Sequence, residues 1–276
     1  MNIHAIGQNM LFGKLGHFLI ILAFATSLAA CLAYFFGTIF RKDTQKSYSW
    51  ISFGRKMFVL HAVSVLGILI TLLIIIHSHL FEYKYVWEHT SKSLPTYYQF
   101  SAMWSGQEGS TLLWMFWHGI LGCILIFKAK EWESPVLSIV ALAQVLLGSM
   151  LLGIYIFGYR MGSSPFALMR DTMDIPIFKM NPDWVADDGT GLNPSLQNYW
   201  MVIHPPTLFL GFAACTIPAA YALASLWLKN FTDWIKPVLP WSLFALMVLG
   251  AGILMGGAWA YEALSFGGFW AWDPVE

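Results

Sequence analysis

The segment that decides the fold is residues 57–80, MFVLHAVSVLGILITLLIIIHSHL, which contains no Asp, Glu, Lys or Arg. A helix needs about 20 predominantly apolar residues to cross a hydrocarbon layer of about 30 Å. A helix on the surface of a soluble protein would instead carry polar residues along one face. The segment therefore predicts a transmembrane helix.

Five further segments have the same character, and none has a charged side chain in its interior: 15–40, 109–127, 135–158, 205–228 and 240–261. Pro135 and Pro240 stand at the expected starts of two of them, where a missing backbone N–H costs nothing. We expect an all-α, polytopic membrane bundle of about six transmembrane helices, forming one domain over residues 1–276.

Composition agrees with this class and excludes others. Only 11% of the 276 residues are charged, 58% are hydrophobic and 17% are aromatic, whereas about 25% of residues are charged in soluble domains. The formal net charge is zero, so no basic field indicates a nucleic-acid partner. Cys31, Cys123 and Cys215 each lie in an apolar segment and are interpreted as packing residues.

The positions of Lys and Arg predict the orientation. The short connections at one end carry nine of them: Arg41, Lys42, Lys46, Arg55, Lys56, Lys128, Lys130, Lys229 and Lys236. The longer connections at the other end carry fewer for their length. Because cytoplasmic loops are enriched in Lys and Arg, we expect the N-terminus and the long loops to be extracytoplasmic.

The aromatic segment 259–272 is the densest cluster in the chain, with three Trp, two Phe and one Tyr around Gly267 and Gly268. Tyr and Trp gather at any membrane interface, so an interfacial belt is one interpretation. Paired glycines allow close backbone approach and aromatic faces suit a flat ligand, so a platform for a planar cofactor is the other. The residues alone leave both open.

His204 differs from the other seven histidines because two prolines follow it directly, in Ile203-His-Pro-Pro206. The prolines fix φ and predict the first turn of a helix, with an amphipathic run from Leu196 to Ile203 as a short interfacial helix before it. An imidazole held rigidly at that boundary is a candidate axial ligand for haem iron. We interpret the other histidines, His118 included, as structural.

Four ordered motifs resemble the family of CcmF-type cytochrome c haem lyases. They are Leu15-Gly-His-Phe-Leu19, Trp104-Ser-Gly-Gln-Glu-Gly109, Asp188-Gly-Thr-Gly-Leu-Asn-Pro-Ser-Leu-Gln197 with the His-Pro-Pro motif, and Phe266-Gly-Gly-Phe-Trp-Ala-Trp-Asp-Pro-Val-Glu276. The last is similar to the tryptophan-rich haem-handling motif of that family, which related synthetases and a haem-export subunit share. The resemblance does not separate the family from its nitrite-reductase-specific paralogue.

The resemblance implies cytochrome c maturation: haem b is held outside the bacterial inner membrane and attached covalently to the C-x-x-C-H motif of apocytochrome c. It implies a CcmE-like haem carrier and a CcmH-like apocytochrome chaperone as partners, in contact with membrane lipid. His204 matches the first external haem-iron ligand. The matching platform residues are Gly267, Gly268, Phe269, Trp270, Trp272 and Asp273, with Phe269 where the family often has Trp.

Two alternatives to a lyase remain, a haem transporter and a non-catalytic haem-binding scaffold. Transporters usually place charged residues within their spans, and the six spans have none. The family's remaining haem ligands lie beyond its tryptophan-rich motif, and Asp273-Pro-Val-Glu276 has the pattern of a helix start. We therefore expect the chain to be the N-terminal portion of a longer protein, and to be inactive alone.

Overall fold

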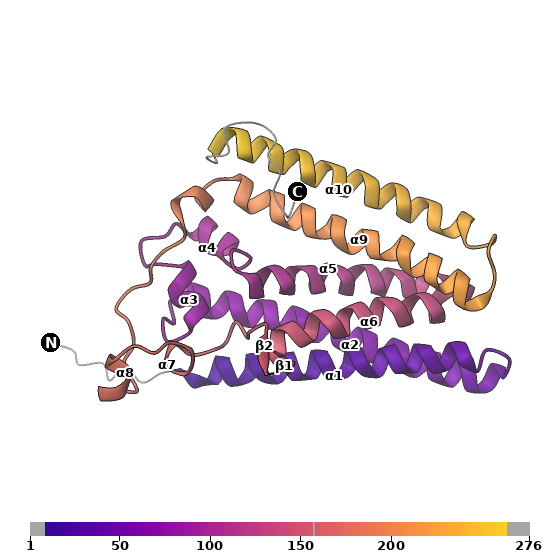
Figure 1. Ribbon diagram of the computed structural model, residues 1–276, viewed down its shortest axis with the longest axis horizontal. Helices are drawn as coiled ribbons and strands as arrows, with labels where there is room; N and C mark the ends of the chain where they lie inside the picture. The colour runs from indigo at the N-terminus through magenta and orange to yellow at the C-terminus, as the bar shows by residue number, and fades with distance from the viewer. Residues whose placement is uncertain (1–8, 157, 264–276) are drawn as a thin grey trace.

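A computed structural model describes residues 9–156 and 158–263 of the chain. In this part, six helices are long and apolar enough to cross a membrane. Their bounds are α1 Met10–Ile39, α2 Thr44–His77, α5 Gln107–Lys128, α6 Glu133–Leu152, α9 Trp200–Leu228 and α10 Ile235–Ala263. They lie roughly alongside one another in an elongated bundle (Figure 1). The predicted all-α membrane bundle is confirmed.

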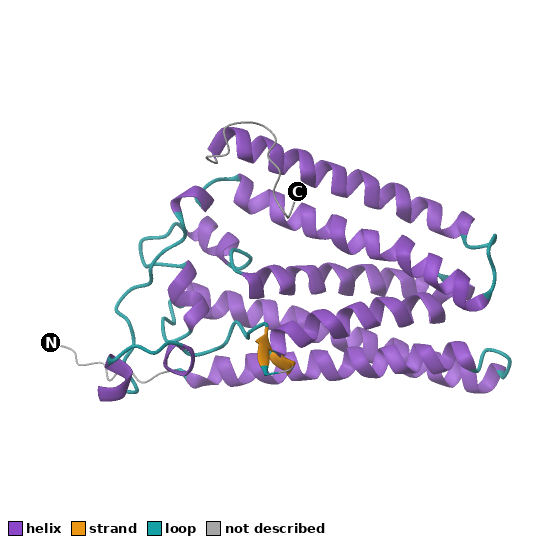
Figure 2. Ribbon diagram, in the orientation of Figure 1, coloured by secondary structure: helices purple, strands orange, loops and turns teal. Residues whose placement is uncertain are grey.

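Short elements fill the connections. They are α3 Lys84–His89, α4 Thr96–Ala102, the 3-10 turn η1 Lys130–Trp132, strands β1 Ile154–Ile156 and β2 Tyr159–Met161, α7 Met169–Thr172, α8 Ile177–Met180 and the 3-10 turn η2 Pro194–Leu196. Figure 2 shows most of them gathered with the long loops at one end of the bundle. At the other end, short turns join α1 to α2 and α9 to α10. The connections at one end of the bundle are therefore short, and those at the other end are long and contain most of the short elements.

Helix α2 begins at Thr44, so the expected loop before residue 57 is wrong. Asp43 starts the helix, because its side chain accepts a hydrogen bond from the backbone N–H of Lys46 at 3.1 Å. Gly54 then lets the helix lie against the ring of Tyr34, since a Cβ there would be 3.2 Å from it. The polar start of α2 is thus held by a cap and by close packing on α1.

Three other boundaries differ from the sequence expectation. Helix α6 ends at Leu152 instead of continuing to residue 158, because Gly153 takes a left-handed φ of 68° and the chain turns into the β1–β2 hairpin. Helix α9 begins at Trp200, so the separate interfacial helix before His204 is wrong. Helix α10 begins at Ile235, which places Pro240 inside the helix instead of at its start.

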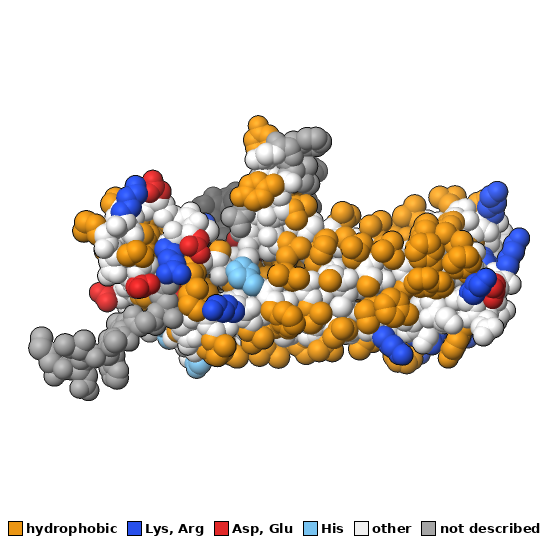
Figure 3. All heavy atoms as spheres, turned by 90° about the horizontal axis from the view of Figure 1, so that it is seen from below, with side chains coloured by type: hydrophobic (Ala, Val, Ile, Leu, Met, Phe, Trp, Pro, Cys, Tyr) orange, Lys and Arg blue, Asp and Glu red, His pale blue; other side chains and the backbone are white. Residues whose placement is uncertain are grey.

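The side chains separate into an apolar middle and polar ends. Figure 3 shows hydrophobic side chains covering the middle of the bundle, with Lys and Arg near the short-turn end and charges of both signs at the long-loop end. The buried side chains form two clusters, one toward each end of the bundle. Helix α10 packs on α9 and lies at one edge of the bundle (Figure 1).

Candidate functional site

His204 lies in the second turn of α9, one turn inside the helix start that the sequence predicted for it, and is only 5% exposed. Its Nδ1 is 2.9 Å from the carbonyl oxygen of Gly252 on α10. A carbonyl only accepts hydrogen bonds, so Nδ1 carries the proton and Nε2 keeps its lone pair. Within the described residues, Nε2 has no hydrogen-bond partner. The imidazole is therefore in the tautomer that binds a metal through Nε2.

Glycines bring α9 and α10 close enough for this contact. A Cβ on Gly252 would be 3.0 Å from the Cα of Leu208, and a Cβ on Gly211 would be 2.7 Å from the Cα of Leu249. Gly252 and Gly256, spaced four apart, are both buried in an unbroken α10. This spacing of small residues is typical of close helix packing.

Trp259 supplies an aromatic wall beside the histidine. Its ring centroid is 5.7 Å from that of His204, with an interplanar angle of 66°, and the residue is 8% exposed. This edge-to-face arrangement is favourable for aromatic rings and restricts the rotation of the imidazole. The first tryptophan of the aromatic segment 259–272 thus helps to position His204.

The first turns of α9 contact a second sequence motif through the carbonyl oxygen of Met201. Pro205 has no N–H, so the carbonyl oxygen of Met201, four residues earlier, lacks its usual donor. The indole Nε1 of Trp104 replaces it, at 2.8 Å. Trp104 is the first residue of the Trp-Ser-Gly-Gln-Glu-Gly motif, so this motif holds the first turns of α9.

Glu262, which is absent from the residues predicted at the site, joins the start of α9 to the end of α10. Its Oε2 accepts hydrogen bonds from the Tyr199 hydroxyl at 3.0 Å and from Trp200 Nε1 at 2.7 Å. A charged acceptor strengthens both bonds. In the sequence, Glu262 is an acidic residue within an otherwise apolar and aromatic segment, which could have marked it as a polar contact.

Tyr85 on α3 organises the start of α5. Its hydroxyl donates toward the carbonyl oxygens of Ala102 and Met103, at 3.1 and 3.0 Å, and accepts from the backbone N–H of Gly106 at 3.1 Å. Burial raises the pKa of the phenol, so the proton stays on the oxygen. Gly109 is required here, because a Cβ would collide with the Met103 carbonyl. The glycine-containing motif therefore folds around Tyr85.

The Asp188-Gly-Thr-Gly191 motif holds the other end of α3. Asp188 Oδ1 accepts from the Lys92 backbone N–H at 2.8 Å, and the Thr190 backbone N–H donates to the Trp87 carbonyl at 2.8 Å. The Lys92 amide, followed by that of Gly189, lowers the pKa of Asp188. The Trp104–Gly109 and Asp188–Gly191 motifs, which are far apart in sequence, thus both contact α3 or the residues next to it. Trp104 connects them to α9 through its hydrogen bond to the Met201 carbonyl.

The remaining predicted site residues lie outside the described part of the chain: Gly267, Gly268, Phe269, Trp270, Trp272 and Asp273. Of the residues predicted at the site, the structure therefore describes His204. His118 pairs with Thr216 at 2.9 Å and His61 with the Ala23 carbonyl at 2.8 Å, both inside the bundle. No cluster of three His, Cys, Asp or Glu suited to a metal occurs in residues 9–156 and 158–263.

Comparison with known proteins gives a consistent picture. A family model described as cytochrome C assembly protein matches residues 104–276. The cytochrome c-type biogenesis protein CcmF of Pseudomonas fluorescens is 37% identical over 204 residues, which is 71% of this chain and 27% of the relative. CcmF of Haemophilus influenzae is 34% identical over 199 residues, 71% of this chain and 28% of the relative. NrfE of Haemophilus influenzae is 30% identical over 266 residues, 95% of this chain and 38% of the relative.

The solved structure of a cytochrome c haem lyase CcmF matches the whole chain with a TM-score of 0.76 and 25% sequence identity, and the match covers 40% of that protein. The chain therefore spans roughly a quarter to two fifths of the length of these relatives.

Proposed function

The chain belongs to the cytochrome c assembly protein family, as a CcmF-type cytochrome c biogenesis protein covering part of the full length, and we propose that it positions haem for covalent attachment to apocytochrome c. The family membership makes cytochrome c maturation the process in which it acts. Haem is the substrate, and apocytochrome c is the acceptor. The finer assignment, a haem lyase of the holocytochrome c synthase type, is part of the proposal.

One observation carries the proposal: His204 Nδ1 faces the Gly252 carbonyl oxygen at 2.9 Å. Metal-binding histidines commonly donate their second ring N–H to a carbonyl or carboxylate, which fixes the ring and makes the free nitrogen a better ligand. His61 makes the same kind of contact with the Ala23 carbonyl inside the bundle, whereas His204 lies at the long-loop end beside Trp259, the first residue of the aromatic segment. His204 would therefore bind haem iron through Nε2.

The protein would contribute orientation, while the reactivity belongs to haem and to the cysteine thiols. Each thiol of the C-x-x-C-H motif adds across one vinyl group, forming a C–S bond and placing the thiol hydrogen on the neighbouring vinyl carbon. His204, held by Gly252 and Trp259, would fix the position of the haem iron. It would therefore also set the distance between the haem vinyl groups and the cysteine thiols.

The platform remains part of this proposal. Gly267, Gly268, Phe269, Trp270, Trp272 and Asp273 follow α10 in sequence, and the last turns of α10 carry Trp259 beside His204. The short chain distance from Trp259 supports a role for these residues on the same haem face.

We propose that the long-loop end is extracytoplasmic and that the membrane is the bacterial inner membrane. Lys and Arg outside the helix middles support this orientation, because the short-turn end carries Arg41, Lys42, Lys128, Lys130 and Lys229 in brief connections. A CcmE-like carrier would deliver haem, and a CcmH-like chaperone would present the apocytochrome, both at the long-loop end.

A non-catalytic haem scaffold is the second candidate, because the described residues offer one imidazole beside the site. The experiment incubates the membrane-embedded full-length protein with reduced haem and a C-x-x-C-H peptide. A lyase forms haem that stays on the peptide through acid-acetone extraction. A peptide with both cysteines changed to serine is the control. Haem bound to the protein without covalent transfer would support the scaffold instead.

A further inference from the structure

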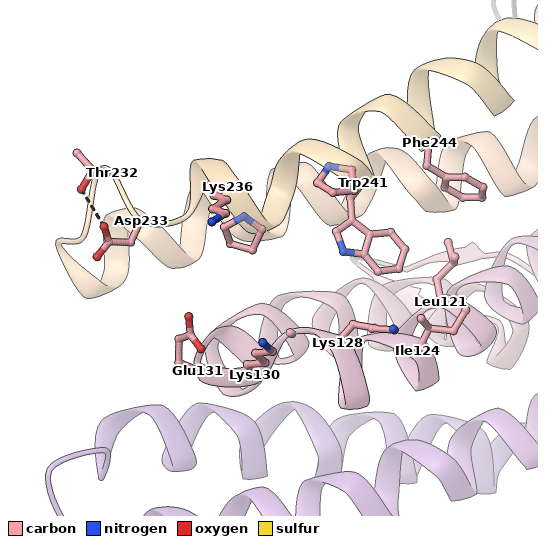
Figure 4. A pocket seen from close by; sticks show the side chains of 13 residues that line it. Leu121, Ile124, Lys128, Lys130, Glu131, Thr232, Asp233, Lys236, Trp241 and Phe244 are labelled. Atoms are coloured by element: carbon pink, nitrogen blue, oxygen red, sulfur yellow. Dashed lines mark hydrogen bonds between the residues drawn. The ribbon is translucent and has the colours of Figure 1, made fainter.

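A groove at the short-turn end has no part in the site described above. It lies between the start of α10 and the end of α5 with η1, and its volume is about 1020 Å³. In Figure 4, Trp241 and Phe244 on α10 face Leu121 and Ile124 on α5. The volume is at the upper end of the range of about 300–1,000 Å³ for small-molecule sites. The inner part of the groove is therefore apolar and large enough for hydrocarbon.

Three lysines stand at the mouth of this groove: Lys128 and Lys130 from α5 and η1, and Lys236 from α10. None of them forms an ion pair with another residue of the described chain. Lys46, at the same end of the bundle, is paired with Asp43 at 3.2 Å. Unpaired cations gathered around one cavity indicate an anionic occupant.

Two acidic residues at the mouth, Glu131 and Asp233, offset part of this charge and leave an excess of one positive charge. Asp233 already accepts hydrogen bonds from Asn230 Nδ2 at 2.9 Å and Thr232 Oγ1 at 3.3 Å. Glu131 is exposed and stands with Asp233 at the outer edge of the groove in Figure 4. From outside inward, the lining thus passes from acids to lysines to aromatic and aliphatic side chains.

Lys130 lines the groove from a left-handed backbone conformation. Its φ is 50°, in the left-handed region that glycine or asparagine normally occupies. A glycine would relieve this conformation, yet the position carries a long cationic side chain directed at the groove.

We propose that the groove binds one anionic phospholipid of the phosphatidylglycerol class. Its phosphate would lie among Lys128, Lys130 and Lys236, and an acyl chain would extend between Trp241 and Ile124. Basic pockets between transmembrane helices are suited to anionic headgroups, and long lysine side chains reach the headgroup level while their methylenes stay in apolar surroundings. The inference is independent of the haem site.

The test uses the protein in nanodiscs that contain phosphatidylglycerol bearing a photoreactive group on one acyl chain. We expect crosslinks on α10 around residues 241–244 and on α5 around residues 121–124. Labelling should be at least fivefold lower in the triple variant Lys128→Gln, Lys130→Gln, Lys236→Gln than in the wild-type protein. The matched arginine variant should keep it within twofold, as should Lys42→Gln with Lys46→Gln.

A second variant separates charge from space. Ile124→Trp fills the groove and leaves all three lysines, so acyl labelling should fall at least threefold while the thermal unfolding temperature is kept. Equal labelling by a phosphatidylethanolamine probe would overturn the proposal, because lipid binding in the groove would then not depend on the headgroup charge. Absence of labelling in the groove of the wild-type protein would also overturn it, and would indicate that protein covers the surface.

Discussion

The indole Nε1 of Trp104 donates a hydrogen bond to the carbonyl oxygen of Met201 at 2.8 Å, and Pro205 is the reason that this oxygen is free. The residues are 97 positions apart and belong to two different motifs. The proline removes one bond from α9, and a loop tryptophan restores it from outside. The outer part of α9, which carries His204, is therefore held by the α4–α5 connection as well as by α10.

The first prediction concerns this bond. Trp104→Phe leaves the buried carbonyl unpaired and should destabilise the protein by about 1–3 kcal/mol, measured by unfolding in detergent. In the background of Pro205→Ala, a backbone N–H can reach Met201, so the same change should cost less. Trp227→Phe, at a residue 37% exposed, is the control and should have little effect. Equal costs in both backgrounds would contradict the account.

The second prediction compares two glycines of α10. A Cβ on Gly252 would lie 3.0 Å from Leu208 Cα, while a Cβ on Gly250 would meet nothing within 4 Å. Gly252→Ala should force the helices apart and cost about 1–3 kcal/mol. Gly250→Ala should gain up to about 1 kcal/mol from helix propensity. Thermal unfolding of the pair measures the difference, and a shift of the same sign in both would be inconsistent with the packing described.

The third prediction concerns the ion pair at the short-turn end. Arg55 Nε and Nη2 lie 2.7 and 2.6 Å from the two carboxylate oxygens of Glu133, which is 6% exposed. Arg55→Met would leave a buried carboxylate without its partner and should cost about 3 kcal/mol. Adding Glu133→Gln should recover part of this loss. Lys46→Met removes only an exposed pair with Asp43 and should cost less than about 1 kcal/mol.

The fourth prediction is a pH dependence of the hydrogen bond between the Lys92 backbone N–H and Asp188, next to α3. The amides of Lys92 and Gly189 stabilise ionised Asp188, so its pKa in the folded protein lies below the ordinary value of 3.8. The contribution of this group is therefore complete above pH 3.8 and is lost as pH falls through the lowered pKa. Amide protection of Lys92, corrected for intrinsic exchange rates, should fall in that window. In Asp188→Asn the fall should be absent; a fall that persists would assign it to another group.

The sequence predicted the six helices well, because uninterrupted apolar segments leave few alternatives in a membrane. It misplaced their ends where polar residues continue a helix, as at Thr44–Lys56 in α2, where a cap at Asp43 and packing of Gly54 decide the boundary. The β1–β2 hairpin was missed because Ile154–Ile156 is as apolar as the helix before it. Only the left-handed Gly153 separates them.

The candidate site was predictable only in part. The two prolines after His204 single it out and predict the start of a helix there, whereas α9 begins at Trp200. The acceptor for His204 is a backbone carbonyl, at Gly252, which has no signature in residue types. Trp259 belongs to an aromatic cluster that is evident in the sequence, whereas the role of Glu262 depends on how α9 and α10 pair, which residue types do not reveal.

The most direct test of the central claim is the haem content of His204→Ala in the full-length protein, measured by pyridine haemochrome assay with and without added imidazole. We predict that the variant unfolds at nearly the wild-type temperature, retains at least tenfold less haem at this site, and recovers haem when imidazole is supplied. His77→Ala, which removes an exposed histidine at the same end, should retain wild-type haem. Wild-type haem content and an unchanged ligand spectrum in His204→Ala would contradict the proposal.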